Sequence, residues 1–464
     1  MAGFDGTNAP TMYLYFYNGS TFVQVTTTDI REITTHRGRT RNDQEYDTGL
    51  LTVVLDNRTG IYDPDFTGST TMVVSGASII QRSMAMYFGM LWSSVVYNQF
   101  YGYLENVVVD QGFDAKVTLT FTDGTDLLAT SFADGSYAIR NAETTSARVS
   151  YVKTLCVNGV FDLETNLKST ITNVVGSGSS VTYTGDKVYL VGEEVTVSGV
   201  NPSGYNLSTR TPITAVSGTS FTVASTATGT YVSGGLASLR HVTMQATLGN
   251  DSPLSMMQEA ARCEANDFYI TNINKSTYEQ RYISTIVFHP IAQKFNRITR
   301  LAFSDSQAAG TVEYDNIETS VSMLQKVNKA VIQYPDFNST GSGQVSAIYG
   351  SGDIASQPIN APVYNPWAAI NLAAYNARKM ATPLSMVKQI EFQAFALDTL
   401  YDDLLLLDLG DQVTVARTTV DGRSQSYNLV VEGIDQTITP NDWRITLYTS
   451  AMNPYYTVID KNGG

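Results

Sequence analysis

Short apolar stretches, in which apolar and polar positions often alternate, run through most of the chain with turn residues between them. Clear cases are residues 12–17, 107–109, 116–121 and 412–415, which are rich in Val, Thr, Tyr and Leu. Successive side chains of a strand point to opposite faces of its sheet, so this pattern predicts strands. We expect a mainly β protein with a few helices, an α+β chain in which helices are the exception.

The most informative stretch is residues 37–66, RGRTRNDQEYDTGLLTVVLDNRTGIYDPDF. It begins with a basic cluster, and the apolar run 50–55 that follows predicts a strand with at least one buried face. Asn, Gly, Asp and Pro come next, which accept left-handed backbone, cap turns or fix φ. The strand is therefore expected to leave the sheet at a turn marked by Asp56, Asn57, Gly60, Tyr62, Asp63 and Pro64.

Three segments carry helical signals. Residues 146–157 place apolar side chains on one face, and two further helices begin at Ser252–Pro253 and Asn365–Pro366, where a capping residue precedes a proline. We expect these stripes to face the core, whereas the Ala-rich third helix also suits close packing on a neighbouring subunit. Its stripe consists of Trp367, Ile370, Ala374 and Ala377.

Residues 165–240 differ in character from their surroundings. Ser, Thr, Gly and Val dominate, and helical periodicity is absent, while helix-bearing segments lie on both sides. This predicts a small β-sandwich or barrel inserted into a host domain.

Two distant stretches resemble each other. Gly102-Tyr103-Leu104 is followed by DAKVTL at 114–119, and Gly433-Ile434-Asp435 is followed by DWRITL at 442–447. Two interpretations stay open. The stretches are hairpins that close two related β-domains, or they match by chance in a chain rich in Thr and Val.

Composition and charge exclude several classes of protein. The net charge of −14 argues against a protein that grips nucleic acid, which needs clustered Lys and Arg. A hydrophobic content of 43% with 16% charged residues is globular. No run of 18 apolar residues occurs, so we expect no membrane-spanning segment, and the N-terminus does not read as a secretory signal. A length of 464 residues predicts two to four domains.

Candidate catalytic and metal chemistry is sparse. His36, His241 and His289 are scattered, so we expect no catalytic residue, no enzyme and no cofactor. Asp56, Asp63 and Asp65, together with Asn57, offer oxygen ligands of the kind that Ca²⁺ prefers. Their spacing is not that of an EF-hand, and we favour a plain turn of Asx hydrogen bonds over a metal site. Cys156 and Cys263 are expected to be buried thiols.

Two charged clusters invite structural interpretations. Asp402, Asp403, Asp408 and Asp411 are predicted to lie in a solvated loop that leads into a strand. Arg37, Arg39 and Arg41 are either solvated or pair with carboxylates across a subunit interface, because arginine engages carboxylates bidentately. We take these arginines, with Trp367 and Ile370, as candidates for subunit contacts.

The segment 37–66 resembles the signature of minor tail proteins of long-tailed bacteriophages. Further similar segments follow in order: FYGYLENVVVD, LTFTDGTDLLAT, LLLLDLGDQVTV and VVEGIDQTITPNDWRITLYTS. Together they cover most of 30–155 and 250–452. The stretch from VGEEVTV to YVSGG at 191–235 resembles a small β-module that recurs in phage structural proteins, here placed as an insertion. The family is similar to tail-tip or baseplate hub proteins of siphoviruses.

The resemblance implies a domain plan. It places a first tail-tube-like β-domain at 1–130 and a second at 331–464, each a β-barrel or sandwich. A helix-containing middle domain takes 131–164 and 241–330, and the inserted β-sandwich module takes 165–240. It also implies a homotrimer that imitates the six-fold tail tube, and the internal similarity noted above is what two related domains would leave in the sequence.

The implied role is structural. The protein would form a ring at the tail tip of the virion, assembled in the host cytoplasm, and contact a distal tail or tail-tube protein, the tape-measure protein, and fibre or receptor-binding proteins. DNA would only pass through the lumen. The alternatives are a hexameric distal-tail ring, an adhesion protein that binds the host envelope or glycans through residues 165–240, and a peptidoglycan-degrading enzyme.

Overall fold

The fold is given by a computed structural model, which describes residues 9–40, 45–130, 141–155, 161–164, 168–189, 191, 193–239, 243–244, 252–264, 267–273, 284–289, 296–306, 309–321, 327–335, 342–349, 355–364, 366–381, 385–394, 397 and 400–452. The prediction of a mainly β chain with a few helices is confirmed. The three predicted helices are present as α2 (Thr145–Leu155), α3 (Pro253–Glu264) and α4 (Pro366–Ala381).

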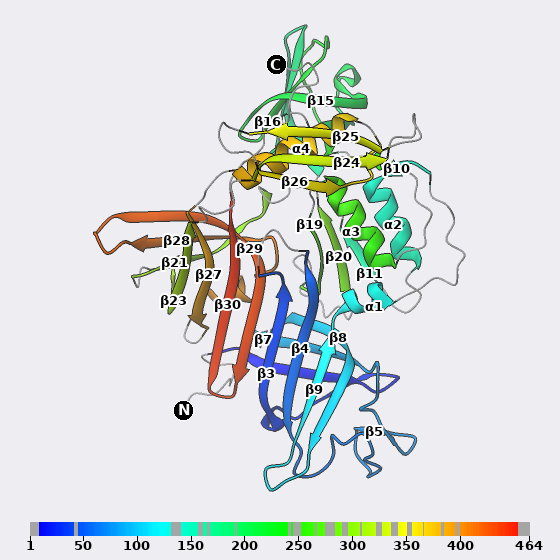
Figure 1. The fold of residues 1–464 in the computed structure, drawn as a ribbon, viewed down its shortest axis with the longest axis vertical. Coiled ribbons are helices and arrows are strands. Elements are labelled where there is room, and N and C mark those ends of the chain that lie inside the picture. The colour runs from blue at the N-terminus through cyan, green and yellow to red at the C-terminus, as the bar shows by residue number, and fades with distance from the viewer. Residues whose placement is uncertain are drawn as a thin grey trace.

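One sheet of 14 strands joins the beginning and the end of the chain (Figure 1). Its first half contains β1 (Thr11–Tyr17), β2 (Phe22–Gln24), β3 (Ile30–Gly38), β4 (Asp47–Asp56), β7 (Ala85–Trp92), β8 (Val95–Asp110) and β9 (Lys116–Thr122). Its second half contains β21 (Thr299–Ser304), β22 (Val312–Glu313), β23 (Asn316–Val321), β27 (Ser385–Gln393), β28 (Gln412–Thr418), β29 (Ser424–Thr439) and β30 (Asp442–Ala451). The halves join where β3 pairs antiparallel with β29.

The two halves repeat one topology. In the first, β3 pairs with β4, β4 with β9, and β9 with β8. In the second, β23 pairs with β27, β27 with β30, and β30 with β29. The hairpin β7–β8 corresponds to β28–β29. The two similar stretches of sequence therefore lie on corresponding hairpins, β8–β9 and β29–β30. One difference is that β1 runs antiparallel to β7, whereas β21 runs parallel to β28.

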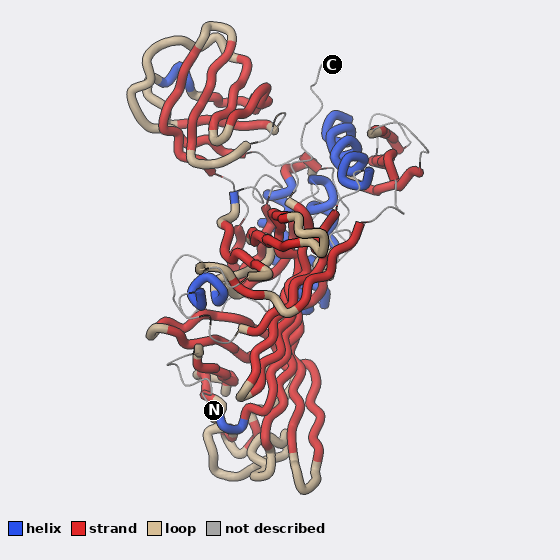
Figure 2. The backbone as a smooth tube through the Cα atoms, turned by 90° about the vertical axis from the view of Figure 1, so that its left-hand side faces the viewer, coloured by secondary structure: helices blue, strands red, loops and turns tan. Residues whose placement is uncertain are grey.

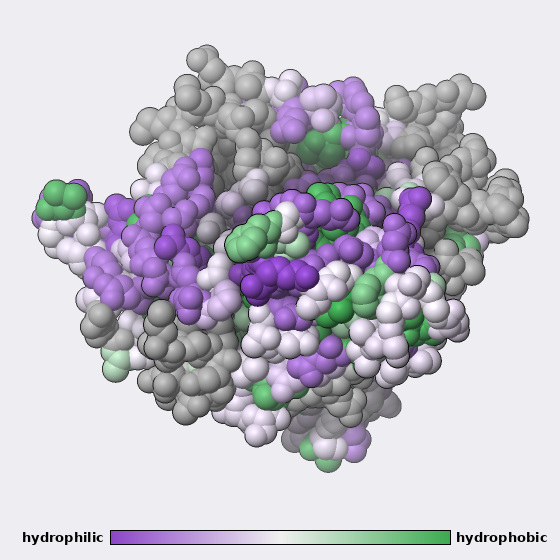
Figure 3. All heavy atoms as spheres, turned by 90° about the horizontal axis from the view of Figure 1, so that it is seen from below, coloured by the Kyte–Doolittle hydropathy of each residue, from purple (hydrophilic) through white to green (hydrophobic). Residues whose placement is uncertain are grey.

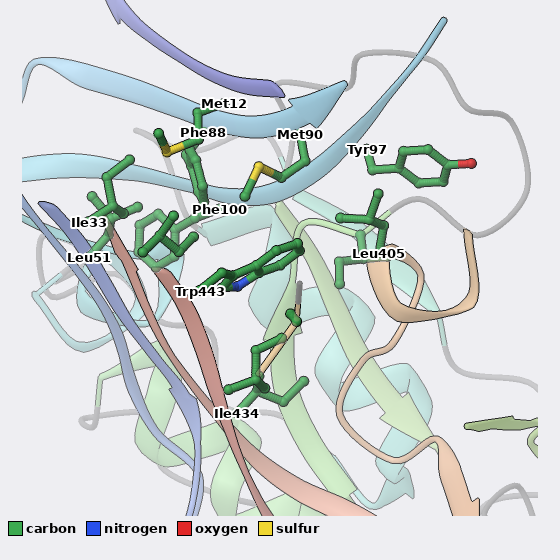
Figure 4. Close-up of a cluster of buried hydrophobic side chains, with 14 of the residues drawn as sticks. Met12, Ile33, Leu51, Phe88, Met90, Tyr97, Phe100, Leu405, Ile434 and Trp443 are labelled. Atoms are coloured by element: carbon green, nitrogen blue, oxygen red, sulfur yellow. The ribbon is translucent and has the colours of Figure 1, made fainter. Parts of the chain in front are cut away.

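The halves share one hydrophobic core. Trp443, Ile434 and Leu405 of the second half face the side chains of Ile33 and Phe100 of the first half (Figure 4). Trp443 is 1% exposed, and its indole nitrogen donates to Gln436 Oε1 at 3.2 Å. Since burial of apolar surface is the main driving force of folding, we expect the two halves to fold as one unit.

A second core lies in the middle part, which is formed by α1 (Gly124–Thr130), α2, α3, α4 and three small sheets. The sheets are β10 (Glu143–Thr144) with β18 (Thr243–Met244), then β11 (Phe161–Glu164), β20 (Ser284–His289) and β19 (Asp267–Thr271), and finally β25 (Ser342–Ile348), β24 (Val327–Pro335) and β26 (Ala355–Asn360). Helix α4 packs on this last sheet, as Figure 2 shows from the side.

The cores divide the chain differently from the sequence-based boundaries at 130 and 330. Leu128 of α1 belongs to the middle core rather than to the first β-domain. Strands β21 to β23 belong to the second half of the large sheet, although they precede residue 331. Conversely, β24 crosses the boundary at 330 and α4 follows it, yet Ile332 of β24 and Ala373 of α4 lie in the middle core. Which core an element joins is determined by pairing between strands that are distant in sequence, and local composition does not reveal this pairing.

A closed six-stranded barrel forms the module between the two segments of the middle part (Figure 2). It consists of β12 (Lys168–Gly176), β13 (Ser180–Gly185), β16 (Ser220–Ala224), β15 (Leu207–Ser217), β14 (Glu194–Ser198) and β17 (Leu236–Leu239). Four of its five aromatic residues, Tyr183, Tyr189, Tyr205 and Phe221, fill the interior and are at most 1% exposed. The fifth, Tyr231, donates its hydroxyl to the carbonyls of Ile171 and Gly234 at 3.0 Å.

The end of the molecule opposite the barrel carries hairpin turns and loops. It includes the turn between β8 and β9, the small hairpin of β5 (Val73–Val74) and β6 (Ala77–Ser78), and the loop after β4. Seen from below in Figure 3, the described surface here is mostly hydrophilic, with small separate hydrophobic patches.

Candidate assembly site

The joint between the halves contains a buried ion pair between Arg39 and Glu432. Arg39 donates to Glu432 Oε2 through Nε at 2.9 Å and Nη2 at 2.6 Å. Tyr46 donates its hydroxyl to the same oxygen at 3.1 Å, and Ser450 donates to Oε1 at 2.5 Å. The Glu432 side chain is 2% exposed and that of Arg39 10%. A buried charge is tolerated when it is paired and hydrogen-bonded, which this carboxylate is.

Gly38 allows this approach of the chains. Its φ is +93°, a conformation that favours glycine. A Cβ at this position would lie 2.3 Å from the carbonyl oxygen of Glu432. The next amide, of Arg39, donates to that same carbonyl at 2.9 Å. The R-G-R order of the sequence thus turns β3 out of the sheet and directs Arg39 at Glu432.

A second buried pair links three parts of the chain. Arg37 Nη1 donates to Asp408 Oδ1 at 3.0 Å, with side chains 3% and 1% exposed. Thr271 of β19 donates its hydroxyl to the other oxygen of Asp408 at 2.7 Å. Tyr269 donates to the carbonyl of Leu409 at 2.6 Å. The segment around Asp408 therefore joins the first half, the second half and the middle part.

These contacts bear on two sequence-based expectations. Arg37 and Arg39 pair with carboxylates of their own chain and are buried rather than solvated, their role in subunit contacts stays a prediction, and Arg41 lies outside the described residues. The prediction of a solvated loop is wrong for Asp408 and Asp411, both of which are 1% exposed. The apolar neighbours of these two residues in LLLLDLGD, and those of Glu432 in VVEGI, were the available signal.

The signature turn is a network of Asx hydrogen bonds. Asn57 is buried, donates its side-chain amide to Asp63 Oδ1 at 2.8 Å, and accepts the backbone amide of Tyr62 at 3.1 Å. Gly60 has a φ of +72°. Tyr62 is fully buried and donates its hydroxyl to Asp29 at 2.8 Å, and burial raises the pKa of its hydroxyl.

The carboxylates considered as metal ligands have other surroundings. Asp56 pairs with Arg58 at 2.5 Å and with Arg31 at 3.3 Å, and its hydrogen bond from Arg58 lowers its pKa to about 2. Asp65 is exposed. Within the described ranges, no group of three or more His, Cys, Asp or Glu side chains is arranged to hold a metal ion.

The other singled-out residues lie apart from the joint. Ile370 is half-buried on α4, and Trp367 belongs to the same helix. Cys263 is a buried free thiol, whose pKa is raised by burial, while Cys156 and His241 lie outside the described residues. None of the helices in the described part of the chain is long and apolar enough to span a membrane.

One face of the large sheet is polar across eight strands. Directly opposed residues of an antiparallel pair share a face, and the registers connect one row across β8, β9, β4, β3, β29, β30, β27 and β23. In this order the row reads Tyr103, Thr122, Leu50, His36, Asp435, Thr446, Glu391 and Asn316. The next row reads Asn106, Thr120, Thr52, Thr34, Thr437, Arg444 and Gln393. The opposite face holds the shared core.

His36 and Asp435 pair at the centre of this polar face. His36 Nδ1 lies 2.5 Å from Asp435 Oδ1, and Tyr448 donates its hydroxyl to Asp435 Oδ2 at 3.0 Å. The hydrogen bond to Asp435 raises the pKa of His36. Both side chains are about one third exposed, at 28% and 36%, so solvent screens the pair.

The eight strands leave two free edges. Each neighbouring pair in the series is antiparallel, so strand direction alternates from β8 at one edge to β23 at the other. Because the number of strands is even, the two edges run in opposite directions. Among the described residues, the second half of β8 pairs only with β9, and β23 pairs only with β27. Val108 on the β8 edge is 54% exposed.

The fold is similar to those of prophage tail proteins. The 43 kDa tail protein of prophage MuSo2 from Shewanella oneidensis matches over 95% of this chain and 98% of its own, with a TM-score of 0.51 at 9% identity. The tail protein from Neisseria meningitidis MC58 matches over 96% and 98%, with a TM-score of 0.52 at 5% identity. The chain shares their fold.

A weaker likeness, with a TM-score of 0.44 at 7% identity, covers 96% of this chain and 78% of the E. coli c3393 protein. That protein is described as a component of the type VI secretion system with structural similarity to the T4 bacteriophage tail proteins gp27 and gp5. Neither a protein-family model nor the sequence of a curated protein matches the chain. At these identities the likeness concerns the fold alone.

Proposed function

We propose that the protein is a structural component of a phage tail, which forms the hub ring at the tail tip of the virion. The observation that carries this proposal is the eight-stranded sheet with alternating strand directions, one polar face and two free edges of opposite direction. The fold shared with two prophage tail proteins supports the same role. The role is architectural rather than catalytic, and a zymogram on peptidoglycan that shows clearing would contradict it.

The free edges allow copies to join head to tail. An exposed edge strand presents unpaired backbone groups and readily pairs with another chain. If β23 of one copy meets β8 of the next, the new pair is antiparallel, and the alternation continues without a break. Heterologous contacts of this kind close into a ring when the rotation from one copy to the next closes, as we propose here. The polar face then lines the bore, and the shared core lies outside it.

Three copies are the favoured number. Each chain holds two similar halves, so three chains present six, which suits a junction with a six-fold tail tube. A six-copy distal-tail ring is the alternative, and its mass would distinguish it. The partners in this proposal are the tail-tube or distal-tail protein, the tape-measure protein, and fibre or receptor-binding proteins.

DNA passes the bore without adhering in this proposal. In the two rows of the polar face, the acidic residues are Asp435 and Glu391 and the basic ones are Arg444 and His36. Threonine is the commonest of the other residues. A face without clustered Lys and Arg offers phosphates no binding site. A ring structure with a strongly positive bore would contradict this part of the proposal.

The test disrupts one free edge. Val108→Lys places a charge on the β8 edge, a device by which proteins prevent edge pairing. We expect the wild-type chain to form rings and the variant to stay monomeric with an unchanged circular dichroism spectrum. Thr437→Lys is the matched control, because Thr437 lies on the same face on an interior strand and should leave the ring intact. Rings of undiminished stability with Val108→Lys would overturn the proposed closure.

A further inference from the structure

The hairpin β28–β29 projects from the molecule. Next to its turn, Arg417 donates to Thr319 Oγ1 at 3.3 Å and the amide of Thr418 donates to the carboxylate of Asp305, whereas the turn itself extends beyond these contacts. Its outer residues, 416–428, are mostly exposed, and Val420 at the turn is 110% exposed. Figure 1 shows the hairpin extending sideways on the β23 side of the sheet, and Figure 3 shows this projection from below with a hydrophobic end. A two-stranded hairpin is marginally stable by itself in water.

Hydrogen bonds close the turn of this hairpin. The amide of Thr419 donates to the carbonyl of Arg423 at 2.9 Å, and that of Gly422 donates back to Thr419 at 2.8 Å. Gly422 has a φ of +81°, and Arg423 pairs with Asp421 at 2.5 Å. Within this closed turn, the Val420 side chain is fully exposed.

The corresponding hairpin of the first half shows where such a tip packs. Trp92, at the end of β7, lies with its ring 4.7 Å from that of Tyr401 in α5 (Tyr401–Leu405). Tyr97 of β8 donates to Asp402 Oδ1 at 2.7 Å, and Gln99 donates to the carbonyl of Leu405 at 3.0 Å. Helix α5 belongs to the second half, so the hairpin β7–β8 crosses the joint between the halves.

The repeat identifies the equivalent receiving segment. Helix α5 lies between β27 and β28, which correspond to β4 and β7. The residues between β4 and β7 are 57–84, which contain the signature turn and the hairpin β5–β6. Val74 in this segment is 42% exposed. In a head-to-tail ring, the second half of one copy meets the first half of the next, just as the two halves meet within a chain.

We propose that the hairpin β28–β29 of one copy packs on residues 57–84 of the next copy, as β7–β8 packs on α5 within the chain. This inference rests on the proposed ring. The inference assigns the hairpin β28–β29 a binding partner, a second copy of this chain. It also assigns residues 57–84, which contain the signature turn, a role in assembly. Val420 is the residue that becomes buried in the contact.

The experiment places the photoreactive residue benzoylphenylalanine at 420 in rings assembled from isotopically light and heavy chains. We expect crosslinks between a light and a heavy chain that map to 57–84. The matched control carries the same residue at position 113, because Phe113 is 104% exposed at the tip of the other hairpin, β8–β9. It should give no crosslink to 57–84 of another copy.

A second measurement uses substitutions. Val420→Asp should raise the protein concentration at which half of the rings have dissociated about tenfold or more. The reason is that a charged side chain would replace a valine that is buried in the ring contact. Phe113→Asp should leave it unchanged. Rings that form while residue 420 crosslinks elsewhere, or not at all, overturn this inference and leave the proposed function standing. A wild-type chain that forms no ring overturns both.

Discussion

The two halves of the large sheet have the same strand order, yet they bury their corresponding hairpins differently. The first half packs the end of β7–β8 on α5 of the second, whereas the outer part of β28–β29, with Val420 at its turn, projects into solvent. The strands β3 and β29 pair with each other at the joint. Their counterparts in the other half are β23 for β3 and β8 for β29, and β23 and the second half of β8 form the free edges. A duplicated unit thus makes one joint within the chain, and the same elements remain available at its outer edges for another copy.

The largest effect should come from breaking the internal joint. Arg39→Met leaves Glu432 buried without its cation, and the removal of one partner of a buried pair costs about 3–5 kcal/mol. The free energy of unfolding, measured by urea denaturation, should fall by that amount. Arg58→Met removes an exposed partner of Asp56 and is the matched control, for which we expect little change. Equal effects of the two substitutions would show that the joint does not depend on its buried pair.

The hairpin that crosses the joint should show the next largest effect. Trp92→Ala removes the ring that packs on Tyr401, and for a partly buried indole we expect a loss of about 2–3 kcal/mol. Val420→Ala in the bare hairpin should change the stability of the isolated chain by less than about 0.5 kcal/mol. A stability loss for Val420→Ala that matches that of Trp92→Ala would mean that both hairpins already pack within the monomer.

Asp123 lies between β9 and α1, and it should make the free energy of unfolding depend on pH. Asp123 accepts the amide of Thr125 at 2.8 Å, and burial raises its pKa to about 6. The folded state therefore holds this proton more tightly than the unfolded state does, so the stability it contributes is full below about pH 4 and is lost as pH rises through about 6.

Asp123→Asn should remove this part of the pH dependence. The variant should be more stable than the wild type at pH 8, by about 3 kcal/mol, and similar to it at pH 4. Urea denaturation at both pH values measures this. A difference that stays constant from pH 4 to pH 8 would contradict the assignment to Asp123.

The smallest effect concerns the signature turn. Asn57→Ala removes the side-chain bonds to Asp63 and Tyr62, and we expect a loss of about 1 kcal/mol in the isolated chain. Thr59→Ala, at an exposed position of the same turn, should be neutral. If the turn serves assembly, Asn57→Ala should weaken the ring more than it weakens the chain.

Much of the fold could be predicted from the sequence because its signals are local. The alternating pattern gave the strands, Ser252–Pro253 and Asn365–Pro366 gave two helix starts, and the short similarity between 102–119 and 433–447 marked the repeat. The division of cores could not be predicted, because β21 and β24 have similar local patterns but pair with different sheets.

The site could be predicted only in part for a related physical reason. The charge pattern identified Arg37 and Arg39 as unusual, but their partners lie more than 370 positions away in sequence. Asp408 was expected in a solvated loop, and Glu432 carried no expectation at all, since burial depends on what folds over a residue. Asp408 and Glu432 both stand in apolar runs of the sequence, and they pair with Arg37 and Arg39 of the arginine cluster near the other end of the chain.

The most direct test of the central claim is the native mass of the full chain at assembly concentration. The claim is that two free, opposite edges of one alternating sheet close identical copies into a ring. It predicts a closed species of three chains of 50.6 kDa each, which is lost with Val108→Lys and kept with Thr437→Lys. A two-fold dimer, or a ring that survives Val108→Lys unchanged, would contradict it.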